Sequence, residues 1–90
     1  NSFFLEIVSG IFLLPYLFFL DKPHLIKLLI LTIYFLLLAF EIFNTSIEKL
    51  SDKITKEIDP DIKKIKDLSS ASVFTVLLIL IILIVLTFFI

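Results

Sequence analysis

Four oxygen-bearing side chains recur at helical spacing in the middle of this sequence. They are Glu41, Asn44, Glu48 and Asp52, hereafter the polar stripe. At about 100° per residue, all four fall within an arc of roughly 80° on one helix face. Carboxylate and amide oxygens are suitable ligands for Mg²⁺. A carboxylate held at the edge of an apolar environment can also serve as a general base.

The alternative explanation is a helix that leaves the membrane, so that its polar face is simply solvated. This explanation suits Asp52, because Lys49 and Lys53 lie close to it in the sequence. It suits Glu41 least, because ionisable groups with hydrocarbon on both sides normally face protein or water and are functional. Asn44 could instead bridge two helices through hydrogen bonds.

A second polar cluster, "KIKDLSSASV", occupies residues 64–73. Lys66 and Asp67 lead directly into the last apolar run, and a lysine at such a boundary is commonly an interfacial anchor. It belongs to a functional site only if it faces the polar stripe. The short connection between Asp52 and Lys66 favours that arrangement.

The elements that must position these residues are membrane helices. The chain has 90 residues, 60% of them hydrophobic. Three apolar runs predict an all-α membrane protein, a helical bundle with three transmembrane helices. The predicted spans are 3–20, 25–43 and 68–90, the second continuing as an amphipathic helix to about 58. The absence of Cys excludes disulfides and thiolate metal sites, and the single Gly excludes a glycine-rich phosphate loop.

Lysines predict the orientation in the membrane. Six lie in the connection between the second and third spans, whereas the first connection contributes only Lys22 and Lys27. Short loops rich in lysine usually stay in the cytoplasm. The N-terminus and the 45–66 hairpin are therefore expected in the cytoplasm, and the C-terminus is expected to face outward.

Two motifs together resemble the prokaryotic diacylglycerol kinase family of small integral membrane lipid kinases. The chain has "EIFNTSIEKLSD" at 41–52 and "IKDLSSASV" at 65–73. The family pattern is Glu-x-x-Asn-[Ser/Thr]-x-Ile-Glu-x-x-x-Asp, then a short hairpin, then Ala-Lys-Asp-x-x-[Ser/Ala]-[Ala/Gly]-[Ala/Ser]-Val. Ile65 replaces the first Ala. The resemblance implies one membrane kinase domain over 1–90, a homotrimer, and phosphorylation of a lipid hydroxyl by ATP and Mg²⁺ at the cytoplasmic interface of a bacterial inner membrane.

The resemblance also assigns roles by position. Glu41 corresponds to the catalytic base, and Glu48 to a ligand of the metal ion on ATP. The residues that correspond to the nucleotide surroundings are Asn44, Glu48, Asp52, Lys66 and Asp67. Those expected near the lipid substrate are Glu6, Glu41 and Ser70.

The chain departs from the family pattern at its start. The family has an amphipathic surface helix and a second metal-binding glutamate upstream of the first residue here, so we expect the chain to be a fragment that lacks both. Phe4 stands where the family usually has a basic residue. The stretch "DKITKE" at 52–57 and the serines after Asp67 favour diacylglycerol as substrate. Undecaprenol, used by related enzymes, remains the alternative.

A non-catalytic protein is the competing class. A small structural oligomer, or an ion-pathway subunit with Glu6 and Glu41 along its path, fits the composition equally well. It leaves the spacing of Lys66 and Asp67 from the polar stripe unexplained. For either class we expect membrane lipids as surroundings and no nucleic-acid partner.

Overall fold

The computed structural model describes residues 2–55 and 57–89, apart from the side chains of Ser2, Phe3 and Glu6. Three helices follow one another: α1 (Ser2–Phe19), α2 (His24–Ile54) and α3 (Pro60–Leu86). Within the described ranges there is no strand, which confirms the predicted all-α class. The molecule is elongated, 51 × 21 × 15 Å.

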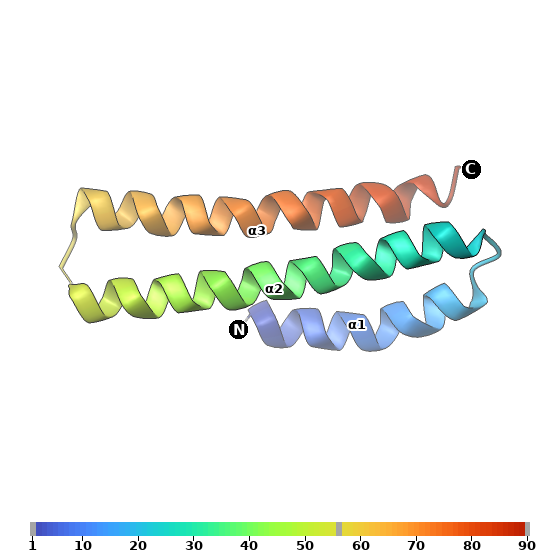
Figure 1. Ribbon diagram of the computed structural model, residues 1–90, viewed down its shortest axis with the longest axis horizontal. Helices are drawn as coiled ribbons and strands as arrows, with labels where there is room; N and C mark the ends of the chain where they lie inside the picture. The colour runs from blue at the N-terminus through green and yellow to red at the C-terminus, as the bar shows by residue number, and fades with distance from the viewer. Residues whose placement is uncertain (1, 56, 90) are drawn as a thin grey trace.

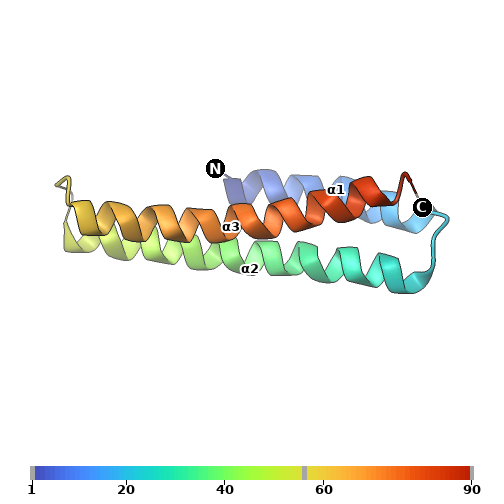
Figure 2. The same cartoon turned by 90° about the horizontal axis from the view of Figure 1, so that it is seen from above.

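The helices run antiparallel and differ in reach. α2 and α3 lie side by side over most of their length, and α1 runs beside the half of α2 that is nearest the α1–α2 connection (Figures 1 and 2). The other half of the α2–α3 pair extends beyond the start of α1 (Figure 1). The residues next to the α2–α3 hairpin, Asp52 and Lys66 among them, belong to this extended half.

Two of the predicted spans have the length and hydropathy of membrane helices. These are α2, with 31 residues, and α3, with 27. The apolar stretch found in α1, Ile7–Phe19, is shorter than a typical span of about 20 residues. α1 continues as a helix through Pro15, so this proline does not end it. The three-span topology stays a prediction.

The core is a narrow strip between the helices, surrounded by exposed apolar side chains. Its buried members are Leu17, Ile30, Tyr34, Leu37, Val73 and Leu80. Outside it, Phe12 is 72% exposed and Phe74 is 63% exposed. Large exposed apolar surfaces of this kind are unfavourable in water and suit a lipid environment.

The hairpin between α2 and α3 is tighter than the sequence suggested. α2 ends at Ile54 instead of near residue 58, because Thr55 adopts an extended backbone with φ −158° and ψ 144°. α3 already begins at Pro60, eight residues before the predicted span 68–90. Asp59 Oδ1 caps α3 by accepting from the backbone N–H groups of Asp61 (2.9 Å) and Ile62 (3.2 Å). Proline suits the first helical position because the missing N–H is not needed there.

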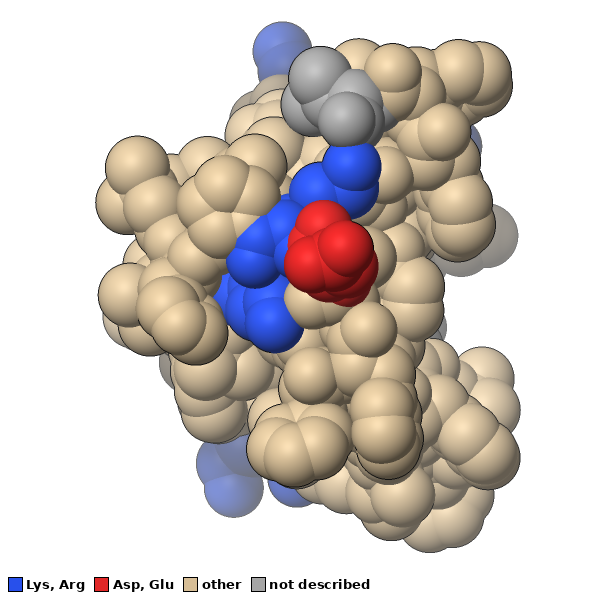
Figure 3. Space-filling view, turned by 90° about the vertical axis from the view of Figure 1, so that its right-hand side faces the viewer, with Lys and Arg blue, Asp and Glu red and all other residues tan. Residues whose placement is uncertain are grey.

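Charge is unevenly distributed between the two ends of the molecule. The α1–α2 end carries Asp21, Lys22 and, in the first turn of α2, Lys27. Figure 3 looks at this end and shows a mostly uncharged surface around one small group of acidic and basic side chains. The α2–α3 hairpin carries most of the lysines. This asymmetry is the basis of the predicted orientation.

Gly10 allows α1 to approach α2 closely. A Cβ at this position would overlap the hydroxyl and ring of Tyr34, which is only 8% exposed.

Gly10→Ala should therefore destabilise the bundle. Overpacking costs about 1–3 kcal/mol, and alanine's better helix propensity offsets about 1 kcal/mol. Thermal unfolding in detergent micelles measures the net loss. A Gly10→Ala variant as stable as the parent would contradict this packing, and combining it with Tyr34→Ala should remove the penalty of the added methyl group.

Candidate functional site

The polar stripe continues the buried face of α2. Along this face Ile30, Tyr34 and Leu37 belong to the core, and Glu41 follows at the same helical spacing with 3% of its surface exposed. Glu41 is thus the point at which one helix face changes from hydrocarbon packing to oxygen-bearing side chains. Of the two surroundings expected from the sequence, protein or water, the structure shows protein for Glu41.

The remaining members of the stripe become progressively more accessible. Asn44 is half-buried, whereas Glu48 and Asp52 are exposed. Glu48 and Asp52 are therefore accessible at the surface of the molecule, whereas Glu41 is shielded. A soluble ligand can contact one end of the stripe directly but not the other.

Asn44 and Glu48 form a pair on adjacent turns. Asn44 Nδ2 donates a hydrogen bond to Glu48 Oε1 at 3.0 Å. Asn44 Oδ1 is buried and has no hydrogen-bond partner among the described residues. A buried acceptor without a partner is uncommon and indicates a ligand, ion or water that completes it. The pair therefore presents one carboxylate and one amide oxygen that a donor or a cation can satisfy.

Asp52 connects the stripe to α3. Lys66 Nζ donates to Asp52 Oδ1 at 2.6 Å, and the two side chains are 36% and 56% exposed respectively. The two residues are 14 positions apart in the sequence. The contact confirms that the second motif faces the first. An exposed pair of this kind contributes at most about 1 kcal/mol to stability, so its position matters more than its strength.

Other predicted residues fall outside this contact. Asp67 is exposed, and its position on α3 is turned about 100° from Lys66. Ser70 is also exposed, while Ser69 beside it is buried. Glu6 belongs to α1, but its side chain lies outside the described residues.

A cleft at the hairpin end adds residues that the sequence did not single out for chemistry. Its volume is about 350 Å³, and it lies beside the Asp52–Lys66 pair. The further lining residues are Thr55, Glu57, Ile58, Asp59, Ile62 and Lys63. Lys63 precedes Lys66 by one helical turn, and this spacing could have indicated that both lysines line one site. From the sequence, Lys63 was used only to predict the membrane orientation. The cleft brings both lysines to the exposed end of the stripe.

The side chains of the polar stripe suit a metal ion that arrives already bound to a ligand. They suit a metal ion held by the protein alone less well. Among the side chains that the structure describes, no three His, Cys, Asp or Glu residues are grouped closely enough to hold a metal ion. Mg²⁺ is typically bound by one or two carboxylates together with phosphate oxygens and water. Glu48 and Asn44 Oδ1 match that partial donor set.

The comparison with protein families favours one of the two classes left open by the sequence. The family model for prokaryotic diacylglycerol kinase matches residues 1–88. This chain belongs to the prokaryotic diacylglycerol kinase family. A search of curated proteins found no match. Membership in the diacylglycerol kinase family supports a membrane lipid kinase that uses ATP, and it makes a non-catalytic membrane protein the weaker interpretation.

The Asp52–Lys66 pair can be tested separately from catalysis. We expect a double-mutant cycle of Asp52→Ala and Lys66→Ala to give a coupling energy of about 1 kcal/mol or less, decreasing with added salt. Unfolding in detergent micelles at low and high ionic strength provides the measurement. A coupling of several kcal/mol that is insensitive to salt would show that the pair is buried in the assembled protein.

Proposed function

We propose that this protein transfers the γ-phosphoryl group of ATP to diacylglycerol and forms phosphatidic acid at the cytoplasmic surface of the membrane. The observation that carries the proposal is the Asp52–Lys66 contact of 2.6 Å. It aligns the polar stripe of α2 with the lysine that precedes the apolar part of α3. A water-soluble nucleotide and a lipid hydroxyl can then meet along a single helix face.

The exposed end of the stripe receives the nucleotide. Lys63 and Lys66 line the cleft at this end and neutralise phosphate charge. Glu48 and the unpartnered oxygen of Asn44 would hold the metal ion that accompanies ATP. Mg²⁺ at this position would neutralise the negative charge that develops on the transferred phosphoryl group. By family position, Asp52 and Asp67 complete the nucleotide surroundings.

The buried end of the stripe receives the lipid. Glu41 accepts the proton of the diacylglycerol hydroxyl as its oxygen attacks the γ-phosphorus. The bond between the γ-phosphorus and the bridging oxygen breaks, and ADP leaves. Burial of Glu41 keeps water away from this carboxylate and so favours the lipid hydroxyl as the acceptor. Glu6 and Ser70 are assigned to the lipid side by family position.

The assembly we propose is a homotrimer of three-span subunits in a bacterial inner membrane. Exposed apolar side chains on all three helices are compatible with both lipid and subunit contacts. The lysine-rich hairpin is placed in the cytoplasm, together with the N-terminus, and the C-terminus faces outward. This orientation puts the nucleotide end of the stripe where ATP is available.

Transfer of radiolabel from ATP into extracted lipid tests the function. The purified protein is reconstituted with Mg²⁺ and either diacylglycerol or undecaprenol, and the labelled product is separated from the aqueous phase. We expect label mainly in phosphatidic acid. Preferential labelling of undecaprenol would reassign the substrate within the same family. No label in either lipid would argue against a kinase and for the non-catalytic alternative.

A further inference from the structure

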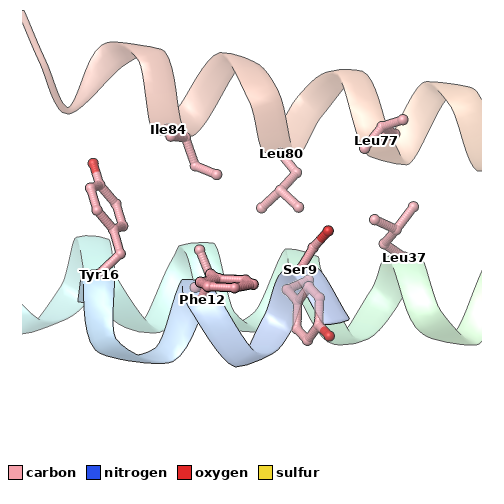
Figure 4. A pocket seen from close by; sticks show the side chains of 9 residues that line it. Ser9, Phe12, Tyr16, Leu37, Leu77, Leu80 and Ile84 are labelled. Carbon is pink, nitrogen blue, oxygen red and sulfur yellow. The ribbon is translucent and has the colours of Figure 1, made fainter. Parts of the chain in front are cut away.

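An apolar cavity lies between the three helices, away from the charged residues. Its volume is about 310 Å³. Figure 4 shows Phe12 and Tyr16 of α1 on one side, with Leu80 and Ile84 of α3 facing them and Leu37 of α2 beside them. The remaining lining residues are Ser9, Leu13, Tyr34 and Leu77. Within a bilayer, a cavity with this lining is suited to hydrocarbon, because no water is available in the membrane core.

The polar atoms at the edges of the cavity are directed elsewhere. Ser9 Oγ donates to the backbone carbonyl of Leu5 at 2.8 Å. Tyr16 Oη and Thr87 Oγ1 share a hydrogen bond of 2.7 Å. Because Thr87 Oγ1 itself donates to the carbonyl of Ile84 at 2.6 Å, Tyr16 is the donor in that bond. With these hydroxyl groups satisfied, the lining offers mainly carbon to an occupant.

One end of the cavity adjoins the candidate site. Leu37 lines the cavity, and Glu41 follows it on the same face of α2, one helical turn away. Both side chains are buried, with exposed fractions of 1% and 3%. A molecule in the cavity therefore has its nearer end about one helical turn from the carboxylate that we propose as the base.

At the far end of the cavity lies a contact between helices that are distant in sequence. Tyr16 of α1 is hydrogen-bonded to Thr87, which is 5% exposed, at the end of α3. The Tyr16 ring also lies against Phe88, with ring centroids 6.3 Å apart. The lining residues of α3 from Leu77 to Ile84 span about 10 Å along the helix axis. The cavity is thus a short slot that starts near Glu41 and ends at Tyr16.

We propose that one acyl chain of the diacylglycerol substrate occupies this slot, and that Leu80 and Ile84 determine how well long chains are accepted. This inference rests on the proposed function, because it assigns the lipid to the same site. The slot holds the chain while the glycerol hydroxyl lies at Glu41. Positioning of this kind converts an encounter within the bilayer into a fixed geometry for transfer.

Tyrosine fluorescence tests occupancy without any turnover. The chain has two Tyr and no Trp, and both tyrosines line the slot. Diacylglycerol with brominated acyl chains is added to vesicles that contain the protein, and phosphatidylcholine with the same chains is added at an equal mole fraction in a parallel sample. We expect saturable quenching by the brominated diacylglycerol that is several-fold stronger than quenching by the brominated phospholipid.

Two variants of neighbouring residues supply the matched control. Leu80→Phe adds bulk inside the slot, whereas Ile81→Phe adds the same bulk at a position that is 47% exposed and outside the lining. We expect Leu80→Phe to lower the ratio of kcat/KM for dioleoylglycerol to kcat/KM for dihexanoylglycerol by about tenfold. A change of one group in an apolar pocket typically has an effect of this size. Ile81→Phe should leave this ratio unchanged. Ile84→Phe is the second slot variant, for use if Leu80→Phe unfolds.

The outcomes separate the two proposals. Equal quenching by the two brominated lipids, or equal chain-length ratios in the slot and control variants, would overturn the slot assignment. Either result would be expected if side chains of a second copy fill the cavity. A protein that phosphorylates no lipid but is still quenched selectively by diacylglycerol would overturn the proposed function and leave the slot assignment standing.

Discussion

Replacing Glu41 by glutamine should lower phosphoryl transfer by about 10²–10⁴-fold while nucleotide affinity stays close to that of the parent. The amide has nearly the same shape as the carboxylate but cannot accept the proton of the lipid hydroxyl. Glu41 lies at the buried end of the stripe, whereas the nucleotide is expected at the exposed end. The two effects should therefore separate in initial rates of label transfer and in titrations with a nucleotide analogue.

A matched control keeps this result specific. Asp61→Asn also replaces a carboxylate by an amide, but at an exposed position in the first turn of α3 that does not line the hairpin cleft. It should retain nearly full activity. If Glu41→Gln weakened nucleotide binding as much as turnover, the residue would be acting on the nucleotide and not as a base.

Glu48→Gln should have the second-largest effect and a different signature. Glutamine Oε1 can still accept the hydrogen bond from Asn44 Nδ2, which is 3.0 Å long in the parent, so the local arrangement is retained. What disappears is the negative charge that holds the cation. Activity should fall by at least about 10–100-fold, the range typical of changes around metal sites.

The metal dependence distinguishes Glu48 from Glu41. Raising the Mg²⁺ concentration should restore part of the activity of Glu48→Gln, because weaker metal binding can be compensated by mass action. The same titration should have no effect on Glu41→Gln, in which the proton acceptor is missing. Identical metal titration curves for the parent and Glu48→Gln would remove Glu48 from the proposed metal site.

The buried position of Glu41 also raises a question of energetics. A carboxylate inside an apolar region is expensive unless the surrounding groups compensate it. The catalytic role that we propose for this carboxylate agrees with the membership in a kinase family.

Properties that depend on local pattern could be predicted from the sequence alone. Helical spacing placed the polar stripe on one face of α2, and long apolar runs indicated membrane helices, because both follow from residue order and side-chain hydropathy. The two polar motifs indicated the family, which the family model then matched over residues 1–88. The position of Lys66 opposite Asp52 was also predictable, since a short hairpin leaves few alternatives.

Properties that depend on distant contacts were decided only by the tertiary structure. Apolar neighbours in the sequence singled out Glu41 within the stripe, but only packing against the other helices determines that Glu41 is buried and Glu48 is exposed. Proximity in sequence likewise linked Asp67 to Lys66, although only Lys66 bonds Asp52. At the far end of the slot, Tyr16 is hydrogen-bonded to Thr87, which is 71 positions away. No local pattern connects residues at such separation, because their contact exists only once all three helices have assembled.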